Sequence, residues 1–334
     1  MSTPKLLAIG AAVQDVFLSH SDEFKAVCKN PHECFMQLEL GSKADVNNID
    51  FSTGGGATNA AVTFARQGLS SAFMGTIGHD PAGQSVLDDL DKEGVDTRGV
   101  TYSDKYNTGY SVLLLSPNGE RTILTYRGAS THYDAKNFDL SQTGADWLYV
   151  SSMAGSMEAL DKIFTQARSL GIKIMFNPGK GELSQLSKLK SLLEDVDVLL
   201  VNKDEAQAIV EGEDWEELVL HMLHYVPTAV ISDGPNGVIA TDGKVIVRAG
   251  MYEDVKVIDR TGAGDAFGSG FLSQWAQGKS LAESIVFASA NSTSVVTKIG
   301  AKVGILHKNA KLHDMPLHEK KVSGHVSVSS ASSR

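Results

Sequence analysis

The sequence predicts an α/β fold, a doubly wound and mostly parallel sheet flanked by helices, together with a smaller group of short strands. Short apolar runs alternate with helical patterns in the second half of the chain, which is typical of a parallel sheet covered by helices on both faces. A second set of runs is irregular and partly alternating, which favours an appendage outside the main sheet. We interpret 147–150, 172–176, 196–201 and 229–231 as main-sheet strands, and 12–18, 35–51 and 98–127 as the irregular set.

The remaining elements follow from local patterns. The run 5–10 is short and apolar, as expected of a buried strand, and three glycines at 54–56 precede a helix with a stripe of small residues. Beyond residue 308 the chain becomes rich in His, Lys and Ser, so we expect one domain over 1–308 and a flexible tail over 309–334. We also expect a strand at 72–77, a helix at 84–92, a hairpin at 110–126 turning at 117–119, a turn at 232–237, and helices at 263–277 and 281–298.

The most informative stretch begins at Asp259 and reads Asp-Arg-Thr-Gly-Ala-Gly-Asp-Ala-Phe-Gly-Ser-Gly-Phe. It follows an apolar run at 255–258, which we interpret as a strand, and it opens a helical pattern. A helix start offers unpaired N–H groups and the positive end of a dipole, so glycines there favour a bound anion. Asp265 would repel that anion unless it has a task, such as accepting a proton from an attacking hydroxyl. This combination points to phosphoryl transfer.

Polar residues also stand at two other strand ends. Asp15 follows the first strand, and Asn59 lies in the first turn of the helix after the three glycines, where a ligand could be contacted. Asn202 and Glu205 open a later helix, either as an N-cap with its capping partner or as oxygen donors that hold magnesium through water. Right-handed crossovers place these loops along one edge of the sheet, so we expect them to converge.

Composition excludes several classes of partner. With 40 acidic against 30 basic residues and a formal charge of -10, no basic face indicates binding to nucleic acid or to a membrane surface. No apolar run approaches the length of a membrane helix, and we expect a soluble, cytoplasmic protein. Cys28 and Cys34 flank His32 and could form a metal cluster or a local disulfide. We expect instead that both remain inert free thiols, because isolated cysteines usually stay reduced in a reducing compartment. A dinucleotide-binding loop is excluded because its third glycine would stand at Phe267.

Taken together, these motifs resemble the ribokinase-like, or phosphofructokinase B, carbohydrate kinases. The segment 259–267 is similar to the family's C-terminal signature, 54–61 to its N-terminal signature, and Asn202-x-x-Glu205 to its magnesium-associated motif. Asp15 and the pattern Ser232-x-Gly234-x-x-Gly237 complete the set, in the family's order over 5–307. The resemblance implies a doubly wound α/β domain with a small β-sheet lid, and family lids often pair, so we expect a homodimer through the lid.

The resemblance also implies an ATP-dependent kinase that transfers the γ-phosphoryl group to a hydroxyl of a sugar or sugar derivative. Asp265 would be the general base, beside a backbone anion hole formed by Gly262, Ala263 and Gly264. The substrate would contact Asp15, Gly55, Gly56, Asn59 and Arg127, and ATP with Mg²⁺ would contact Asn202, Glu205, Ser232, Gly234 and Gly237. Asp259 and Thr261 resemble a monovalent-cation site, which predicts a role for potassium.

The substrate itself stays open at this level. Ribokinases commonly carry Asn, Lys and Glu where this chain has Val13, Gly56 and the loop 151–153, so ribose is not favoured. Arg127 suits the carboxylate or phosphate of an acidic or phosphorylated sugar, although a surface arginine at a strand end is an equal alternative. The rival is an adenosine-type nucleoside kinase, and a catalytically silent sugar-binding regulator is less favoured. Candidates for stacking on a nucleoside base are Phe17, Tyr110 and Tyr126.

Overall fold

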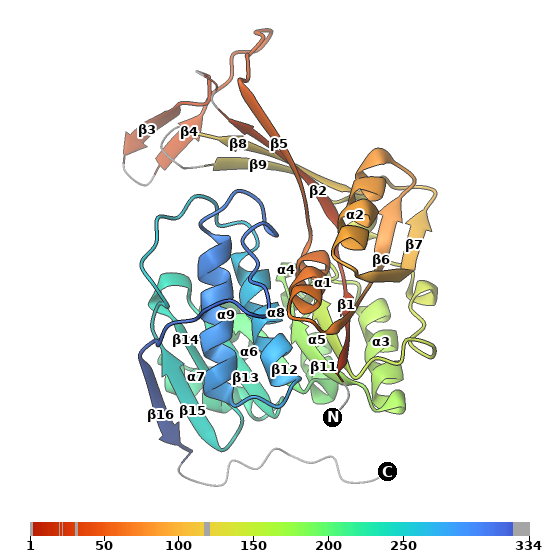
Figure 1. Cartoon of the computed structure of the whole chain (residues 1–334), viewed down its shortest axis with the longest axis vertical. Helices are drawn as coiled ribbons and strands as arrows, with labels where there is room; N and C mark the ends of the chain where they lie inside the picture. The colour runs from red at the N-terminus through yellow and green to blue at the C-terminus, as the bar shows by residue number, and fades with distance from the viewer. Residues whose placement is uncertain (1–2, 20, 22, 31–32, 117–120, 323–334) are drawn as a thin grey trace.

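The computed structural model describes residues 3–19, 21, 23–30, 33–116 and 121–322. Within these residues, ten strands form one large sheet at the centre of the main domain (Figure 1). They are β1 (Lys5–Ile9), β6 (Ser70–Gly78), β7 (Asp96–Ser103), β10 (Trp147–Ser151), β11 (Lys173–Asn177), β12 (Val198–Asn202), β13 (Thr228–Ser232), β14 (Val238–Thr241), β15 (Val245–Ala249) and β16 (Leu317–Lys321).

The strand order is β16-β15-β14-β13-β12-β11-β10-β1-β6-β7. All pairings from β13 through to β7 are parallel, while β14, β15 and β16 add an antiparallel edge. The order reverses at β1, which has β10 on one side and β6 on the other. In open α/β sheets, ligands bind beyond the carboxyl ends of the strands at such a reversal.

Helices cover both faces of this sheet, as predicted. Successive side chains of a strand point to opposite faces, and accordingly Leu7 and Ile9 of β1 belong to one buried apolar cluster while Leu6 and Ala8 belong to the other. On the first face lie α3 (Met157–Leu170), α5 (Leu186–Leu192), α6 (Lys203–Ile209) and α7 (Trp215–Met222), with the short α4 (Lys180–Leu183) beside them. On the second face lie α1 (Gly56–Arg66), α2 (Pro81–Lys92), α8 (Ala263–Trp275) and α9 (Leu281–Val295).

A separate four-stranded sheet, called the lid below, stands off the main domain (Figure 1). Its strands are β2 (Val13–Ser19), β5 (Asn48–Gly54), β8 (Gly109–Leu115) and β9 (Arg121–Tyr126), in the order β5-β2-β8-β9, and a further hairpin consists of β3 (Ala26–Asn30) and β4 (Glu33–Met36). The small separate sheet confirms the predicted fold class. One boundary is corrected, because residues 98–103 belong to β7, which pairs in parallel with β6 at the edge of the main sheet. The predicted hairpin turn at 117–119 lies outside the described residues.

Two further predictions of local structure are wrong. The run 255–258 is not a strand, since it has no ladder partner within the described chain, and Val257 and Ile258 remain 42% and 47% exposed. The segment after residue 308 is not uniformly flexible, because β16 pairs antiparallel with β15 and continues the main sheet. Local composition did not reveal β16, since a strand on a sheet edge takes its order from the neighbouring strand. The last residues of the predicted tail, 323–334, lie outside the described part.

The two cysteines form a disulfide, which corrects the expected free thiols. Cys28 and Cys34 stand opposite each other in the β3–β4 pairing, with their Cα atoms 3.9 Å apart. This register follows from a hairpin that the sequence pattern did not resolve. Separately, no helix in the described ranges is both long and apolar enough to cross a bilayer.

Candidate active site

Two glycine-rich loops and the first loop of the chain meet at the point where the strand order reverses. In the loop before α1, Gly55 has a φ of 99°, and a Cβ atom there would lie 2.3 Å from the carbonyl oxygen of Ala11. Only glycine allows this approach. The first loop is held from the other side by Ser130, whose hydroxyl donates to the carbonyl of Ala12 at 2.9 Å. The positions of these loops are therefore mutually dependent.

Asp265 belongs to the first turn of α8, and its side chain reaches the first turn of α1. The side-chain amide of Asn59 donates to its Oδ2 at 2.8 Å, and the backbone of Gly56 lies against its Oδ1, where an added Cβ would be 3.1 Å away. Burial raises the pKa of Asp265, and the bond from Asn59 and the charge of Lys302 act in the opposite direction. The carboxylate is half-buried, so it is held by protein on one side while a ligand can approach.

The start of α8 provides backbone donors beside this carboxylate. Gly262 caps the helix in the left-handed conformation at φ 78°, where a Cβ would meet the Cβ of Ala301 at 2.5 Å. The N–H of Ala263 makes a long bond of 3.3 Å to the carbonyl of Arg260, whereas a Cβ on Gly264 would meet no atom within 4 Å. The first N–H groups of a helix have no acceptor within it. The predicted anion hole therefore opens onto free space next to Asp265.

Two buried polar atoms near Asp265 have no partner among the described residues. They are Oδ1 of Asn59 and the hydroxyl of Tyr149, and the negative charge of Asp265 acts on Tyr149. An unsatisfied buried polar atom in a folded protein calls for an explanation, such as a bound ligand or water. Because Asn59 uses its amide nitrogen on Asp265, its oxygen is left as an acceptor for a ligand hydroxyl. This arrangement fits the predicted substrate role of Asn59.

Asp15 reaches the same region from the lid. Burial raises its pKa to about 6, while a hydrogen bond from Ser111 and the charge of Lys302 act against that rise, and the charges of Asp259 and Asp265 add to it. The side chain is 5% exposed. The lid strand β2 thus brings a second carboxylate close to the glycine-rich loop before α1, as the sequence predicted.

Three of the five predicted nucleotide residues line a cavity of about 180 Å³, whereas Asn202 and Glu205 do not. Ser232, Gly234 and Gly237 line it together with Ala263 and Gly264 of the anion hole. The helix α9 adds three hydroxyl side chains that were not predicted, namely Ser289, Ser292 and Thr293. Asn291, by contrast, is buried and bonds to Ala266 and Leu306, so its role is to fix α9 in place.

Asn202 and Glu205 form a reciprocal capping box. Oδ1 of Asn202 accepts from the N–H of Glu205 at 2.9 Å, and Oε2 of Glu205 accepts from the N–H of Asn202 at 2.9 Å. Burial is the main cause that raises the pKa of Glu205. The capping interpretation is thereby satisfied, while Oε1 of Glu205 remains outside these two bonds. Within the described residues, no cluster of three His, Cys, Asp or Glu side chains is arranged to hold a metal directly.

Asp259 is 2% exposed and receives several donors. Its Oδ1 accepts from the N–H and the hydroxyl of Thr261 at 3.0 and 2.7 Å, and its Oδ2 accepts from the N–H of Gly300 at 3.1 Å. Hydrogen-bond donors from the protein thus occupy both oxygens of this carboxylate. The potassium site at Asp259 and Thr261 stays a prediction.

Arg121 of the lid, which was not predicted, approaches the glycine-rich loop before α8. Nη1 of Arg121 lies 3.7 Å from Oδ1 of Asp259, and its buried Nε has no partner among the described residues. Arg127, the arginine that was predicted, is exposed beyond the end of β9, and no described hydrogen bond or ion pair involves its side chain. Strand pairing places Arg121 opposite Leu115, and this non-local register is the signal that would have identified it.

Glu182 is a further buried acid that was missed. It is fully buried and accepts from the hydroxyl of Ser152 and from the N–H groups of Met153, Gly155 and Gly179, at 2.8 to 2.9 Å. It therefore ties the loop after β10, where ribokinases carry a glutamate, to the start of α4. Four donors satisfy this carboxylate, and its role is structural.

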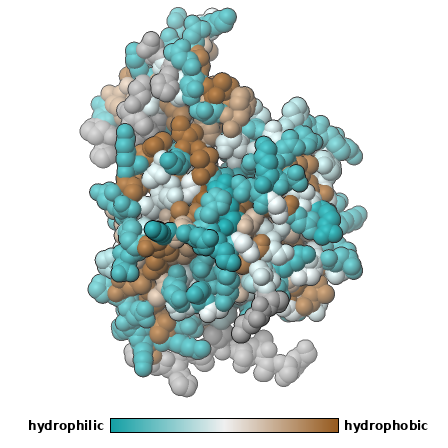
Figure 2. All heavy atoms as spheres, in the orientation of Figure 1, coloured by the Kyte–Doolittle hydropathy of each residue, from teal (hydrophilic) through white to brown (hydrophobic). Residues whose placement is uncertain are grey.

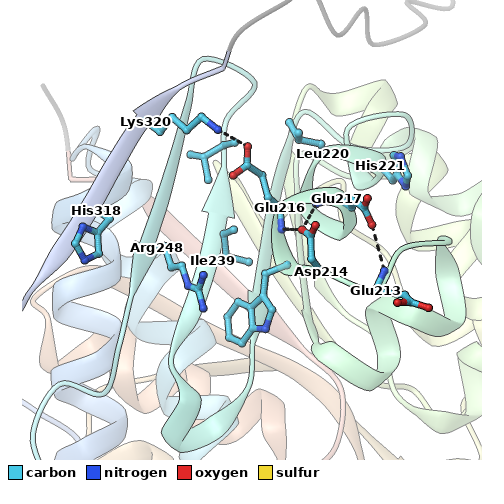
Figure 3. Close-up of a pocket in the computed structure, with 12 residues that line it drawn as sticks. Glu213, Asp214, Glu216, Glu217, Leu220, His221, Ile239, Arg248, His318 and Lys320 are labelled. Carbon is cyan, nitrogen blue, oxygen red and sulfur yellow. Dashed lines mark hydrogen bonds and ion pairs between the residues drawn. The ribbon is translucent and has the colours of Figure 1, made fainter.

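A larger cavity, of about 820 Å³, lies elsewhere, between α7 and the strands β14 to β16 (Figure 3). Its charged side chains already pair with one another, as Nζ of Lys320 lies 2.6 Å from Oε1 of Glu216. The guanidinium of Arg248 lies 5.3 Å from the ring centre of Trp215. No glycine loop is among the residues that line it, so volume alone is a poor guide to the chemistry.

Comparison with known proteins gives a consistent result. The family of pfkB carbohydrate kinases matches residues 29–308. A ribokinase of Haemophilus influenzae is 28% identical over 270 residues, covering 77% of this chain and 85% of that protein. A probable fructokinase-7 of Arabidopsis thaliana is 28% identical over 285 residues, covering 78% and 82%. The structure of a putative ribokinase II from E. coli, in complex with ATP and Mg²⁺, superposes with a TM-score of 0.77 at 19% identity, covering 91% of this chain and 96% of that one.

Proposed function

The chain belongs to the pfkB family of carbohydrate kinases, and from this premise we propose that it transfers the γ-phosphoryl group of ATP to a hydroxyl of a sugar or sugar derivative. The observation that carries the proposal is the position of Asp265, which lies beside the backbone donors at the start of α8 and accepts a hydrogen bond from Asn59 at 2.8 Å. Deprotonation of an alcohol and neutralisation of phosphoryl charge would then occur at one place.

In the proposed reaction, the acceptor oxygen forms a bond to the γ-phosphorus as the bond to the bridging oxygen of ADP breaks. The proton of the hydroxyl passes to the carboxylate of Asp265, whose raised pKa suits a base that must work near neutral pH. The amides from Gly262 to Gly264 stabilise the negative charge on the transferred group. Asp15 and Oδ1 of Asn59 orient the sugar by accepting hydrogen bonds from its hydroxyl groups.

The residues present fit ATP and magnesium. The cavity of about 180 Å³ that contains Ser232, Gly234 and Gly237 adjoins the anion hole, which suits a nucleotide whose last phosphate reaches Asp265. Asn202 and Glu205 would hold Mg²⁺ through its water ligands, consistent with the tendency of this ion to keep several waters. Magnesium would supply neutralisation of the phosphate charge.

The placement of lid aromatics favours a sugar over a nucleoside. Phe17 is fully buried. Tyr110 of β8 pairs with Tyr126 of β9, and the next residue of β8 is Ser111. Ser111 bonds Asp15, and adjacent strand residues face opposite sides of a sheet. Both tyrosines therefore point away from the face that carries Asp15, and none of the three is placed to stack on a base at the site.

A substrate panel tests the proposed function. Pentoses, hexoses, acidic and phosphorylated sugars and nucleosides are each incubated with ATP and Mg²⁺, and ADP release is measured against the Asp265→Asn variant as a blank. We expect at least one sugar to be turned over. Acidic and phosphorylated sugars are included because the positive charge of Arg121 would attract an anionic substrate. ADP release with a nucleoside but with no sugar would support the nucleoside alternative. No ADP release with any compound would support a sugar-binding regulator.

We further propose that a second copy of the chain covers the outer face of the lid, defined here by Ile49, Phe51, Leu124 and Tyr126. Figure 2 shows apolar side chains exposed over the lid strands. The four side chains are 53%, 66%, 57% and 50% exposed, and pairing through β2 and β8 places them on the face opposite Asp15. Exposed apolar patches of this kind mark protein interfaces.

Sedimentation analysis checks the proposed dimer. The wild-type chain is expected to sediment as a dimer at micromolar concentration, and the double variant Phe51→Lys, Leu124→Lys as a monomer, because two charges would be desolvated in the interface. Leu170→Lys is a matched control, since Leu170 is 48% exposed on α3, and it should remain dimeric. A monomeric wild type, or a dimeric double variant, would refute this interface.

A further inference from the structure

The chain beyond residue 308 packs onto a loop that lines the nucleotide cavity, the cavity of about 180 Å³ described above. The family match ends at residue 308, where the N–H of Lys308 donates to the carbonyl of Arg66 at the end of α1. From there, residues 309–316 lead to β16 at the edge of the main sheet (Figure 1). We call residues 309–316 the C-terminal strap, and they lie outside the residues that the family match covers.

Two contacts fix the far end of the strap beside the cavity. Met315 is 7% exposed and belongs to the apolar cluster on the second face of the main sheet. In the ladder of β15 and β16, Leu317 stands opposite Ala249, the last residue of β15. The chain then leaves β15, and residues 250–252 all line the nucleotide cavity. The strap therefore ends next to the segment that forms one wall of this cavity.

Within the strap, His313 contacts Tyr252 of that wall in two ways. The centres of the two rings are 4.0 Å apart and their planes differ by 24°, which is a stacked arrangement. The backbone N–H of His313 also donates to the hydroxyl of Tyr252 at 2.8 Å. On its other side, Nε2 of His313 lies 3.4 Å from Oε2 of Glu253. One residue of the strap thus holds both the ring and the hydroxyl of the tyrosine.

Tyr252 has little other support from the backbone around it. It lies between β15 and α8 in a segment without helix or strand, and residues 251–257 make no backbone–backbone hydrogen bond in the described chain. Segments with few such bonds are held weakly and open easily. The position of the tyrosine ring therefore depends on its side-chain contacts, chief among them the stack on His313.

The cavity offers few surfaces for a planar base. Its lining consists largely of glycine, alanine, serine and threonine residues, and Tyr252 and Phe267 are the two aromatic residues in it. Phe267 is 8% exposed and packs in the core. Because His313 covers one face of the tyrosine ring, the edge and the opposite face remain for a ligand. Aromatic surfaces of this kind are where a flat heterocycle gains most from contact.

We propose that His313 is a positioning residue that holds Tyr252 against the base of the bound nucleotide. This inference rests on the proposed function, since it assigns the cavity to ATP. Tyr252 touches the base, while His313 acts only through Tyr252, by fixing its ring before the nucleotide arrives. Ordering a group in advance removes part of the entropy cost of binding.

The competing explanation is that His313 only fastens the strap to the domain. Replacement of His313 would lower the melting temperature under either explanation, so the readout has to separate the base from the phosphates. We therefore measure by calorimetry the affinity for a non-hydrolysable ATP analogue and for inorganic tripolyphosphate, each with Mg²⁺. Tripolyphosphate carries the phosphates without a base, so a general disturbance of the cavity would weaken both ligands.

His313→Ala is expected to weaken binding of the ATP analogue about tenfold, the scale of one aromatic stacking contact, and to leave tripolyphosphate within about twofold. His313→Phe keeps a ring and the backbone N–H, so it should bind the analogue nearly as wild type does. His79→Ala is the matched control, because His79 stacks on Tyr102 at 4.6 Å and lies 3.4 Å from Asp104 but does not line the cavity. It should bind both ligands as wild type does.

A double-mutant cycle tests whether His313 acts through Tyr252. In a Tyr252→Ala background, His313→Ala should cause no further loss of affinity for the ATP analogue, because the ring that it positions is gone. Additive losses would overturn the proposal, as would a folded His313→Ala that binds the analogue as tightly as wild type or loses both ligands equally.

These outcomes separate the inference from the proposed function. If wild type binds the ATP analogue and His313→Ala binds it equally well, the role of His313 is refuted and the proposed kinase activity stands. If wild type binds no ATP analogue at all, the assignment of the cavity to ATP is wrong, and both the proposed function and this inference fall with it.

Discussion

Replacement of Asp265 by asparagine is expected to lower kcat by about a hundred- to ten-thousandfold, the usual cost of losing a general base. The asparagine oxygen can still accept the bond from Asn59, which in the wild type measures 2.8 Å, so the shape of the site should survive. What is lost is the ability to hold a proton, because an amide does not take one up near neutral pH. Turnover is measured as ADP release with saturating ATP and the sugar identified by the panel.

Asp197→Asn serves as the matched control for this variant. Asp197 also has a pKa raised by burial and accepts a backbone hydrogen bond, from Ile174 at 2.8 Å, yet it lies before β12, at the end of the strands remote from the glycine loop. Its replacement should leave kcat within about twofold of wild type, as is usual away from special sites. Near-native turnover in Asp265→Asn would mean that another group takes the proton.

Gly262→Ala is expected to lower kcat by about a hundred- to a thousandfold, as does loss of a donor to a developing anion. The methyl group would lie 2.5 Å from the Cβ of Ala301, so the start of α8 has to move and its N–H groups no longer point at the transferred group. The backbone conformation at φ 78° adds strain of roughly 1–2 kcal/mol for a residue with a Cβ. Steady-state kinetics and a thermal melt measure the two effects separately.

Gly278→Ala isolates the strain from the displacement. Gly278 has nearly the same φ, 79°, but a Cβ there would meet no atom within 4 Å. We therefore expect a similar loss of stability from backbone strain and unchanged turnover. If Gly278→Ala were as inactive as Gly262→Ala, or if Gly262→Ala kept its turnover, the backbone donors of α8 would not be the anion hole.

The parts of the fold that could be predicted are those encoded by local patterns. The helix α8 follows from the spacing of its apolar residues, and both Phe267 and Phe271 are buried as that spacing requires. Asp15, Asn59 and Asp265 could be placed together because loops after parallel strands share one edge of a sheet. The capping box at Asn202 and Glu205 could also be predicted from the sequence. The same two residues could cap the helix or hold magnesium, and the hydrogen bonds observed are those of the cap.

The features that were missed depend on contacts between distant segments. Arg121 is recognisable only from its pairing with Leu115 across the lid, and Lys302 only from the meeting of β5, α2 and the loop after α9. The Cys28–Cys34 bond requires the hairpin register. Nothing in the residues next to Arg121 or Lys302 indicates their partners, whereas the spacing of the two cysteines had left a local disulfide open as an alternative.

The central claim is that Asp265 accepts a proton during the reaction and is not simply a residue that holds the sugar. The most direct test is to measure, on Asp265→Asn, both the affinity for the sugar by calorimetry and the rate of a single turnover with bound ATP. We predict an affinity within a few-fold of wild type and a single-turnover rate reduced at least about a hundredfold. A weakened affinity with an unchanged single-turnover rate would contradict the account.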